Sequence, residues 1–156
     1  MKSPVLLWII DLCIFVCYII FGDSMEKIVI SGSAKLRDKV EYWIEKFKNY
    51  EILDYPKLIL KENYKEELPL IYKNFYSNIE KTDIFFLMNE EKNGIKGYIG
   101  TSGMSELTYA VILNLIHNKN IKIYILNMPD KSLSCYDEIK NFLDMGWIEL
   151  YKRKSE

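Results

Sequence analysis

The chain has 156 residues, of which 49% are hydrophobic and 14% aromatic, enough for one domain with an apolar core. The formal net charge is −1, and residues 25–156 carry equal numbers of acidic and basic side chains, so no basic field exists to bind a nucleic-acid polymer. Three cysteines without a framework and a single histidine exclude a disulfide scaffold and a zinc site, so we predict no metal, no cofactor and a reducing, cytoplasmic compartment.

The N-terminal segment 5–21 is apolar apart from Asp11. It is at the short limit for crossing a bilayer, and a central aspartate costs about 2.5–3.5 kcal/mol on insertion. It is also a poor signal peptide, because its apolar run is long and its cleavage site indifferent. Met25 opens a clean first strand, so residues 1–24 are interpreted as an N-terminal extension, either a mis-assigned start, a membrane anchor or a signal. Residues 25–156 form the predicted domain, which would meet a membrane only if residues 5–21 are translated.

The first half of the domain alternates short apolar runs with helical patterns. The pattern predicts a strand over 27–31, a helix with one apolar face over 36–47 and a second strand over 50–53. A loop over 57–66 and a helix over 69–81 with Pro69 in its first turn are predicted to follow.

The second half continues this alternation. The pattern predicts a buried strand over 83–88, an apolar helix over 107–117 and a strand over 122–126. A helix over 132–144, ended by Gly146, and a last strand over 147–151 complete the domain. Strands that alternate with helices indicate a three-layer α/β/α fold with a parallel sheet, and five strands favour the order 2-1-3-4-5.

In that order, the turn 31–33 and the glycine-rich stretch 94–106 meet at one edge of the sheet, where α/β proteins hold ligands. Glu106 falls in the first turn of the predicted helix, whose N-terminus would keep its carboxylate ionised as a nucleophile or base. The spacing of Gly103 and Glu106 also fits a helix cap, and that alternative stays open. The turn 31–33 and the hydroxyl side chains are open to equally plain structural roles.

Three segments resemble nucleoside 2-deoxyribosyltransferase-like proteins: MEKIVISGS at 25–33, IEKTDIFFLMN at 79–89 and the stretch 94–110 with its GIK-x-YIG pattern. The resemblance implies a flavodoxin-like fold in which Glu106 attacks the sugar C1′ of a nucleoside or nucleotide and forms a glycosyl ester. Transfer to another base, or to water, would complete the reaction, as in retaining glycosidases. It also implies that the loop 31–35 and the hydroxyls of Thr101 and Ser102 hold the sugar and any 5′-phosphate. Homodimers or higher homo-oligomers are expected on the same ground.

The chain departs from the family at one position. An aspartate that contacts the base stands in those enzymes where this chain has Phe75, so leaving-group activation would fall to Asp83, Glu90 or Glu91, or be absent. Tyr98 either stacks on a base or packs, and Asp83 is as plausibly a residue at the start of a strand.

Two functions therefore follow from the sequence, an N-glycosidase or deoxyribosyltransferase-like enzyme and a non-catalytic nucleotide-binding module. The predicted catalytic residues are Glu106 and Asp83. The predicted substrate-binding residues are Ser31, Gly32, Ser33, Asn89, Tyr98, Gly100, Thr101, Ser102 and Gly103.

Overall fold

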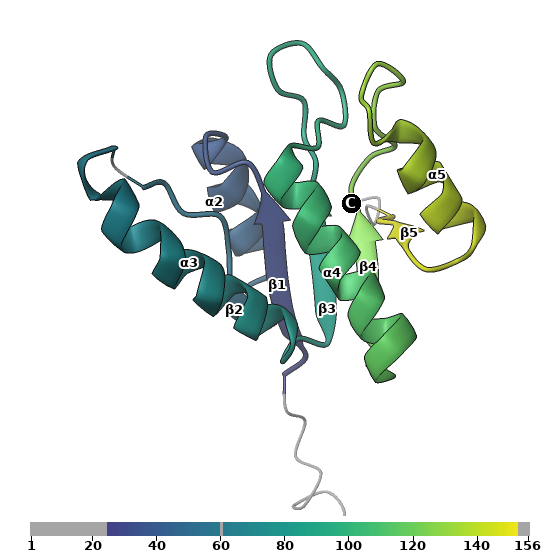
Figure 1. Ribbon diagram of the computed structural model, residues 1–156, viewed down its shortest axis with the longest axis horizontal. Coiled ribbons are helices and arrows are strands. Elements are labelled where there is room, and N and C mark those ends of the chain that lie inside the picture. Colours follow the sequence, from purple (N-terminus) through teal and green to yellow (C-terminus); the bar gives the residue numbers. More distant parts are fainter. Residues whose placement is uncertain (1–24, 60, 153–156) are drawn as a thin grey trace, which may run out of the picture.

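The computed structural model describes residues 25–59 and 61–152 of the chain. Within them, five parallel strands form one sheet in the order β2-β1-β3-β4-β5 (Figure 1), which confirms the predicted topology. The strands are β1 (Lys27–Gly32), β2 (Glu51–Asp54), β3 (Ile84–Met88), β4 (Lys122–Ile125) and β5 (Glu149–Leu150).

Helices cover both faces of the sheet. They are α2 (Arg37–Lys46), α3 (Tyr64–Ile79), α4 (Thr101–His117) and α5 (Tyr136–Asp144), and a short 3₁₀ turn, η1 (Lys61–Asn63), precedes α3. Alternate residues of a strand point to opposite faces. In β3, Phe85 and Leu87 accordingly pack in the cluster that contains α3, α4 and α5, whereas Phe86 packs with α2. The two clusters are the cores of a three-layer α/β/α domain, as predicted.

The helix α3 begins earlier than predicted. Residues 57–66 were expected to be a loop and Pro69 to open the helix, but η1 and the first turn of α3 occupy part of that segment and Pro69 lies inside the helix. Glu66 and Glu67 fall in the first turn, where carboxylates favour the positive end of the helix dipole. The predicted start of this helix was wrong because Pro69, which suits the first turn of a helix, lies inside α3.

The helix α4 also begins earlier than predicted, at Thr101. Its glycine and hydroxyl residues were read as loop formers, but Gly103 is helical and buried. A Cβ at Gly103 would lie 3.4 Å from Leu87 Cδ1. The glycine therefore serves close packing of the helix on the sheet, and Glu106 lies in the second turn of α4 rather than the first.

The last helix and strand are shorter than predicted. The backbone N–H and hydroxyl of Ser132 both donate to Asp130 Oδ1, so a side-chain turn occupies the segment before α5. No helix within residues 25–59 and 61–152 is both long and apolar enough to cross a membrane. The interpretations of the segment 5–21 lie outside the described residues.

Candidate active site

Glu106 and Ser31 meet at the edge of the sheet where β1 and β3 end. Ser31, the next-to-last residue of β1, is wholly buried, and its Oγ donates a hydrogen bond to Glu106 Oε2 over 2.5 Å. This contact confirms that the turn 31–33 and the stretch 94–106 come together. Glu106 Oε1 has no hydrogen-bond partner within the described part of the chain, and it is not sealed from solvent.

The surroundings of Glu106 make its ionisation costly. Burial raises the pKa of this carboxyl from 4.5 to about 7; the hydrogen bond from Ser31 lowers it and the charge of Asp54 raises it. The expectation that the helix N-terminus keeps Glu106 ionised was wrong, because the residue lies beyond the first turn, where the dipole acts. At neutral pH a substantial fraction of Glu106 is therefore protonated.

The alternative in which Glu106 caps the helix was also wrong. Gly100 is the N-cap of α4, and Gly103, the other half of the expected capping pair, lies inside the helix. The carboxylate bonds across the fold to Ser31 instead of turning back to a backbone N–H. The position of Glu106 is thus set by a contact between α4 and the strand β1.

Glu106 lines a cleft of about 500 Å³, a size suited to a small-molecule ligand. The helix α3 and the segment before it supply an apolar and aromatic lining of Leu58, Tyr64, Leu68, Ile71, Tyr72 and Phe75. The polar lining comes from the carboxyl end of β1, the last residues of the segment 89–100 and the first turn of α4. It includes Gly32, Ser33, Tyr98, Gly100, Thr101, Ser102 and Gly103. Seven predicted substrate-binding residues therefore lie around the predicted nucleophile.

Lysines add positive charge to the lining of the cleft. Lys92 Nζ donates to Ser33 Oγ over 2.9 Å and lies 4.7 Å from the centre of the Tyr98 ring. Lys57 also lines the cleft but is paired with Asp54, its Nζ lying 2.7 Å from Asp54 Oδ1. Tyr98 thus contacts a lysine, so a base that stacked on that face of the ring would have to displace it.

Asn89 does not line the cleft; it joins the two segments that border it. Its side-chain nitrogen donates to the carbonyls of Gly97 and Asn127, and its side-chain oxygen accepts from the Asn127 backbone N–H. Asn89 is 1% exposed and uses its amide fully. Its role is to position the segment 89–100.

The carboxylates that the sequence offered for leaving-group activation lie elsewhere. Asp83 precedes β3, at the opposite end of the strand from Glu106, and accepts a hydrogen bond from the Lys27 backbone N–H. Glu90 accepts a hydrogen bond from Trp43 Nε1, and Glu91 is exposed. The structure thus brings none of these three to the lining of the cleft, and Asp83 is the strand-start residue of the plainer alternative.

Sequence reasoning missed Tyr72, Tyr76, Lys92 and Asp54. The two tyrosines are four residues apart on α3 and so share a face, but which face meets the cleft depends on how the helix packs. Asp54 is the last residue of β2, at the same edge of the sheet. A carboxylate at the carboxyl end of a parallel strand was the signal that could have identified it.

Gly97 makes the segment 89–100 possible. Its φ is +59°, and a Cβ there would lie 2.5 Å from the Met128 carbonyl oxygen. Gly97→Ala is therefore expected to destabilise the fold by about 3 kcal/mol. Gly94→Ala is the matched control, since Gly94 has φ +78° but nothing within 4 Å, and should lose about 1 kcal/mol. Urea denaturation measures both losses, and equal losses would contradict the assigned close contact.

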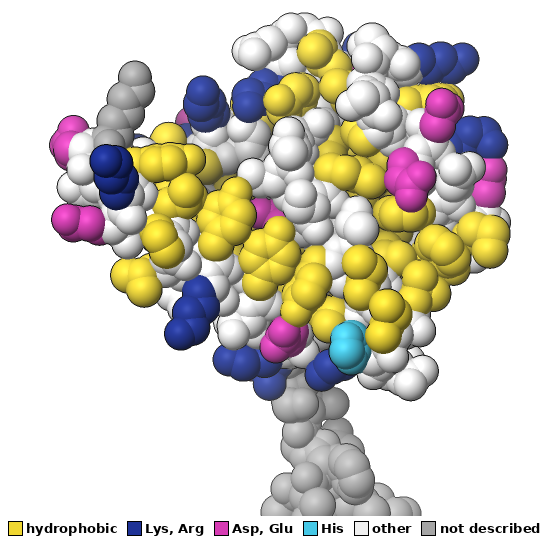
Figure 2. All heavy atoms as spheres, viewed as in Figure 1, with side chains coloured by type: hydrophobic (Ala, Val, Ile, Leu, Met, Phe, Trp, Pro, Cys, Tyr) yellow, Lys and Arg dark blue, Asp and Glu magenta, His cyan; other side chains and the backbone are white. Residues whose placement is uncertain are grey.

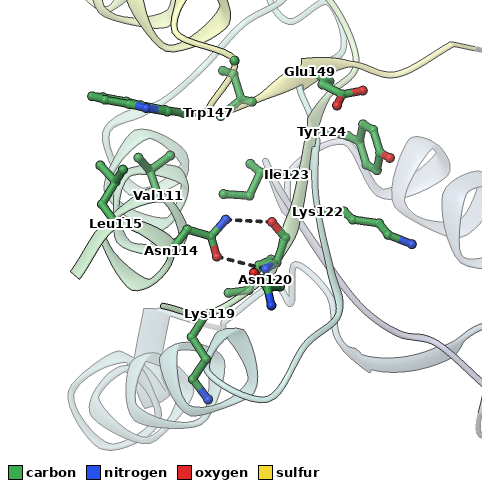
Figure 3. Close-up of a pocket in the computed structure, with 13 residues that line it drawn as sticks. Val111, Asn114, Leu115, Lys119, Asn120, Lys122, Ile123, Tyr124, Trp147 and Glu149 are labelled. Atoms are coloured by element: carbon green, nitrogen blue, oxygen red, sulfur yellow. Dashed lines mark hydrogen bonds between the residues drawn. The ribbon is translucent and has the colours of Figure 1, made fainter. Parts of the chain in front are cut away.

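A second cavity, of about 450 Å³, is lined by the second half of α4, the start of β4 and the segment 146–149 (Figure 3). The Asn114 amide crosses part of it, accepting from the Ile121 N–H and donating to the Ile121 carbonyl. Lys122 Nζ is paired with Glu26. The Asn114 amide and the Lys122 ammonium are therefore used within the fold. Within the described residues, no group of three or more His, Cys, Asp or Glu is placed to bind a metal ion.

No family model matches the chain, and no curated protein matches it. Among solved structures, the chain is similar to the CMP N-glycosidase BcmB of Clostridium botulinum, with a TM-score of 0.48 and 11% identity over 82% of this chain and 91% of that one. A likeness at this level does not carry residues or substrates from one protein to the other. Membership of the family that the sequence resembles therefore stays a prediction.

Proposed function

We propose that this chain is a nucleoside or nucleotide N-glycosidase, or a 2-deoxyribosyltransferase-like enzyme, with Glu106 as its nucleophile. The observation that carries the proposal is a mostly buried carboxylate that lines a ligand-sized cleft, with one oxygen held by Ser31 and the other without a partner in the described chain. An oriented carboxylate with a free oxygen is suited to attack an oxocarbenium-like carbon. The sequence resemblance implies that this carbon is C1′ of a nucleoside or nucleotide.

In the proposed reaction, Glu106 Oε1 forms a bond to C1′ as the bond from C1′ to the base nitrogen breaks. The electron pair of that bond leaves with the base. Water, or a second base, then attacks C1′ and releases Glu106. The bond from Ser31 orients the carboxylate and stabilises its ionised form, the form that attacks. No metal or cofactor enters either step.

The two kinds of lining suit the two ends of such a substrate. The aromatic and apolar residues of α3 offer a surface for a base, and Thr101 and Ser102 offer hydroxyls for a sugar. Ser33 and Lys92 lie together at the end of β1, where a 5′-phosphate would be accommodated. A compound with an apolar ring, a hydroxylated centre and an anionic end would therefore match the whole cleft.

The alternative is a non-catalytic nucleotide-binding module of the same fold. One observation favours it: Glu106 is the one carboxylate among the described residues that line the cleft, and Phe75 fills the position of the aspartate in the enzymes that the sequence resembles. Such a module would bind the same compounds without cleaving them.

Base release separates the two functions. The full chain is incubated with deoxynucleosides, ribonucleosides and their 5′-monophosphates, and free base is measured by liquid chromatography. Release of base supports the enzyme. Thermal stabilisation by the same compounds without base release supports the binding module. If the compounds cause neither base release nor stabilisation, both functions are contradicted.

We also propose that the chain forms a homodimer through α4. Hydrophobic side chains gather over α3 and α4 (Figure 2), and Ile112, Leu115 and Ile116 are 39%, 50% and 68% exposed. A contiguous apolar face of this kind is typical of an interaction surface. The double variant Ile112→Glu, Ile116→Glu is expected to be monomeric by light scattering, while wild type and the control Met145→Glu, also on an exposed hydrophobic residue, remain dimers. A monomeric wild type would contradict the proposal.

A further inference from the structure

Tyr76 packs between the rings of Tyr72 and Tyr109, and the three hydroxyls are used differently. Tyr72 Oη lies 3.1 Å from Ser102 Oγ, and Tyr109 Oη donates to Glu80 Oε1 over 2.5 Å. The Tyr76 hydroxyl has no hydrogen-bond partner in the part of the chain that the structure describes. It is not sealed in the core either, since no described side-chain oxygen is both buried and without a partner. Tyr76 thus presents an uncommitted O–H donor.

Tyr76 and Glu106 lie in the same cleft and interact electrostatically. Both line it, with Tyr76 in the fourth turn of α3 and Glu106 in the second turn of α4. Packing fixes the Tyr76 ring, whose centre lies 5.0 Å from that of Tyr109 and 6.1 Å from that of Tyr72. A ring held on both sides keeps its hydroxyl in one place, which a proton donor requires.

We infer that Tyr76 protonates the departing base, in place of the carboxylate that the cleft lacks at Phe75. This role rests on the proposed function of Glu106. Tyr76 follows Phe75 directly on α3, so it is the nearest hydroxyl along the chain to the position where the related enzymes carry an aspartate. No carboxylate other than Glu106 competes for this role among the described residues of the cleft.

The charge on Glu106 couples the two groups through the reaction. Burial raises the pKa of Tyr76, and the negative charge of Glu106 raises it further. When Glu106 forms the ester, that charge disappears, so the Tyr76 pKa falls at the moment when the base needs a proton. The phenol is thus held protonated before the step and becomes a stronger acid during it.

The proton balance closes over one turnover. The bond between C1′ and the base nitrogen breaks, its electron pair goes to the base, and the base takes the proton of the Tyr76 O–H. Water then attacks C1′ of the ester; its oxygen becomes the sugar hydroxyl and its second proton returns to the Tyr76 phenolate. Regeneration of the Glu106 carboxylate again raises the Tyr76 pKa, which favours this return. No oxidant, metal or other reactant is required.

The test compares leaving groups that do and do not need a proton. For the sugar that the wild type releases, kcat/KM is measured on the nucleoside and on the corresponding 4-nitrophenyl glycoside, whose nitrophenolate leaves without protonation. Tyr76→Phe is expected to lose about 100-fold on the nucleoside and less than threefold on the nitrophenyl glycoside. The removal of one hydroxyl preserves the ring packing, and a melting curve confirms that the variant is folded.

Tyr109→Phe is the matched control, because it loses a tyrosine hydroxyl that neighbours Tyr76 but is bonded to Glu80. Its ratio of the two kcat/KM values should equal that of the wild type. If Tyr76→Phe loses equally on both substrates, or on neither, the role of Tyr76 as acid is overturned while the glycosidase stands. If the wild type itself cleaves neither substrate, the proposed function fails and this role fails with it.

Discussion

Glu106→Gln is expected to abolish base release, with a loss of about a thousandfold or more in kcat. The amide is nearly the same size as the carboxylate and its oxygen still accepts the hydrogen bond from Ser31, so the cleft keeps its shape. It cannot form a stable ester with C1′. The dissociation constant of an unreactive nucleoside analogue should change by less than about tenfold, since binding relies on the rest of the cleft.

Glu149→Gln is the matched control, an exposed glutamate on β5 that is expected to leave turnover unchanged. Stopped assays of released base over a range of enzyme concentrations measure both variants. A Glu106→Gln protein that retains even a tenth of the wild-type rate would show that another group attacks the sugar, or that no covalent step occurs.

Glu106 is also expected to make the stability of the fold fall as the pH rises. Its pKa is 4.5 when exposed and about 7 in the folded protein, so between these values the folded state binds more protons than the unfolded state. The free energy of unfolding therefore decreases from pH 4.5 upward and levels off above pH 7. The full difference corresponds to about 3 kcal/mol.

The comparison with Glu106→Gln isolates this effect from all other titrations. The difference in free energy of unfolding between the variant and the wild type should shift in favour of the variant by about 3 kcal/mol between pH 4.5 and pH 8. Urea denaturation at several pH values measures it. Parallel pH profiles for the two proteins would contradict the raised pKa, and with it the burial of the carboxylate.

The sheet could be predicted from the sequence because its strands are buried on both faces. The apolar runs around Ile28, Phe85 and Ile123 are short, rich in β-branched and aromatic residues, and separated by helical patterns. That alternation restricts the connections to right-handed crossovers and leaves few strand orders. The meeting of Ser31 and Glu106 followed directly from the order.

Where the helices begin was harder to predict, since the same residue types serve turns and close packing. Gly103 lies inside α4 because it packs on Leu87, a reason that no local pattern reveals. Because that start was misplaced, Glu106 was expected to act at a helix terminus. Burial instead raises its pKa to about 7, and the hydrogen bond from Ser31 offsets only part of that rise.

The remaining site residues depended on tertiary packing. Asp83 lies just before β3, at the opposite end of that strand from Glu106, and does not line the cleft. Tyr76 and Lys92 reach the cleft from different segments, α3 and the loop after β3, and no motif joins them. Asn89, predicted to touch a ligand, is used entirely in holding the neighbouring backbone in place.

The covalent attack of Glu106 on the sugar is tested most directly by the mass of the peptide that contains Glu106 after reaction. The full chain is mixed with a substrate that it cleaves, quenched in acid within milliseconds, digested and sequenced by mass spectrometry. Nucleophilic attack by Glu106 predicts an increase equal to the mass of the bound sugar, or sugar phosphate, on Glu106 itself, and no such adduct in Glu106→Gln. An adduct on another residue, or base release at full rate with no adduct at any quench time, would contradict it.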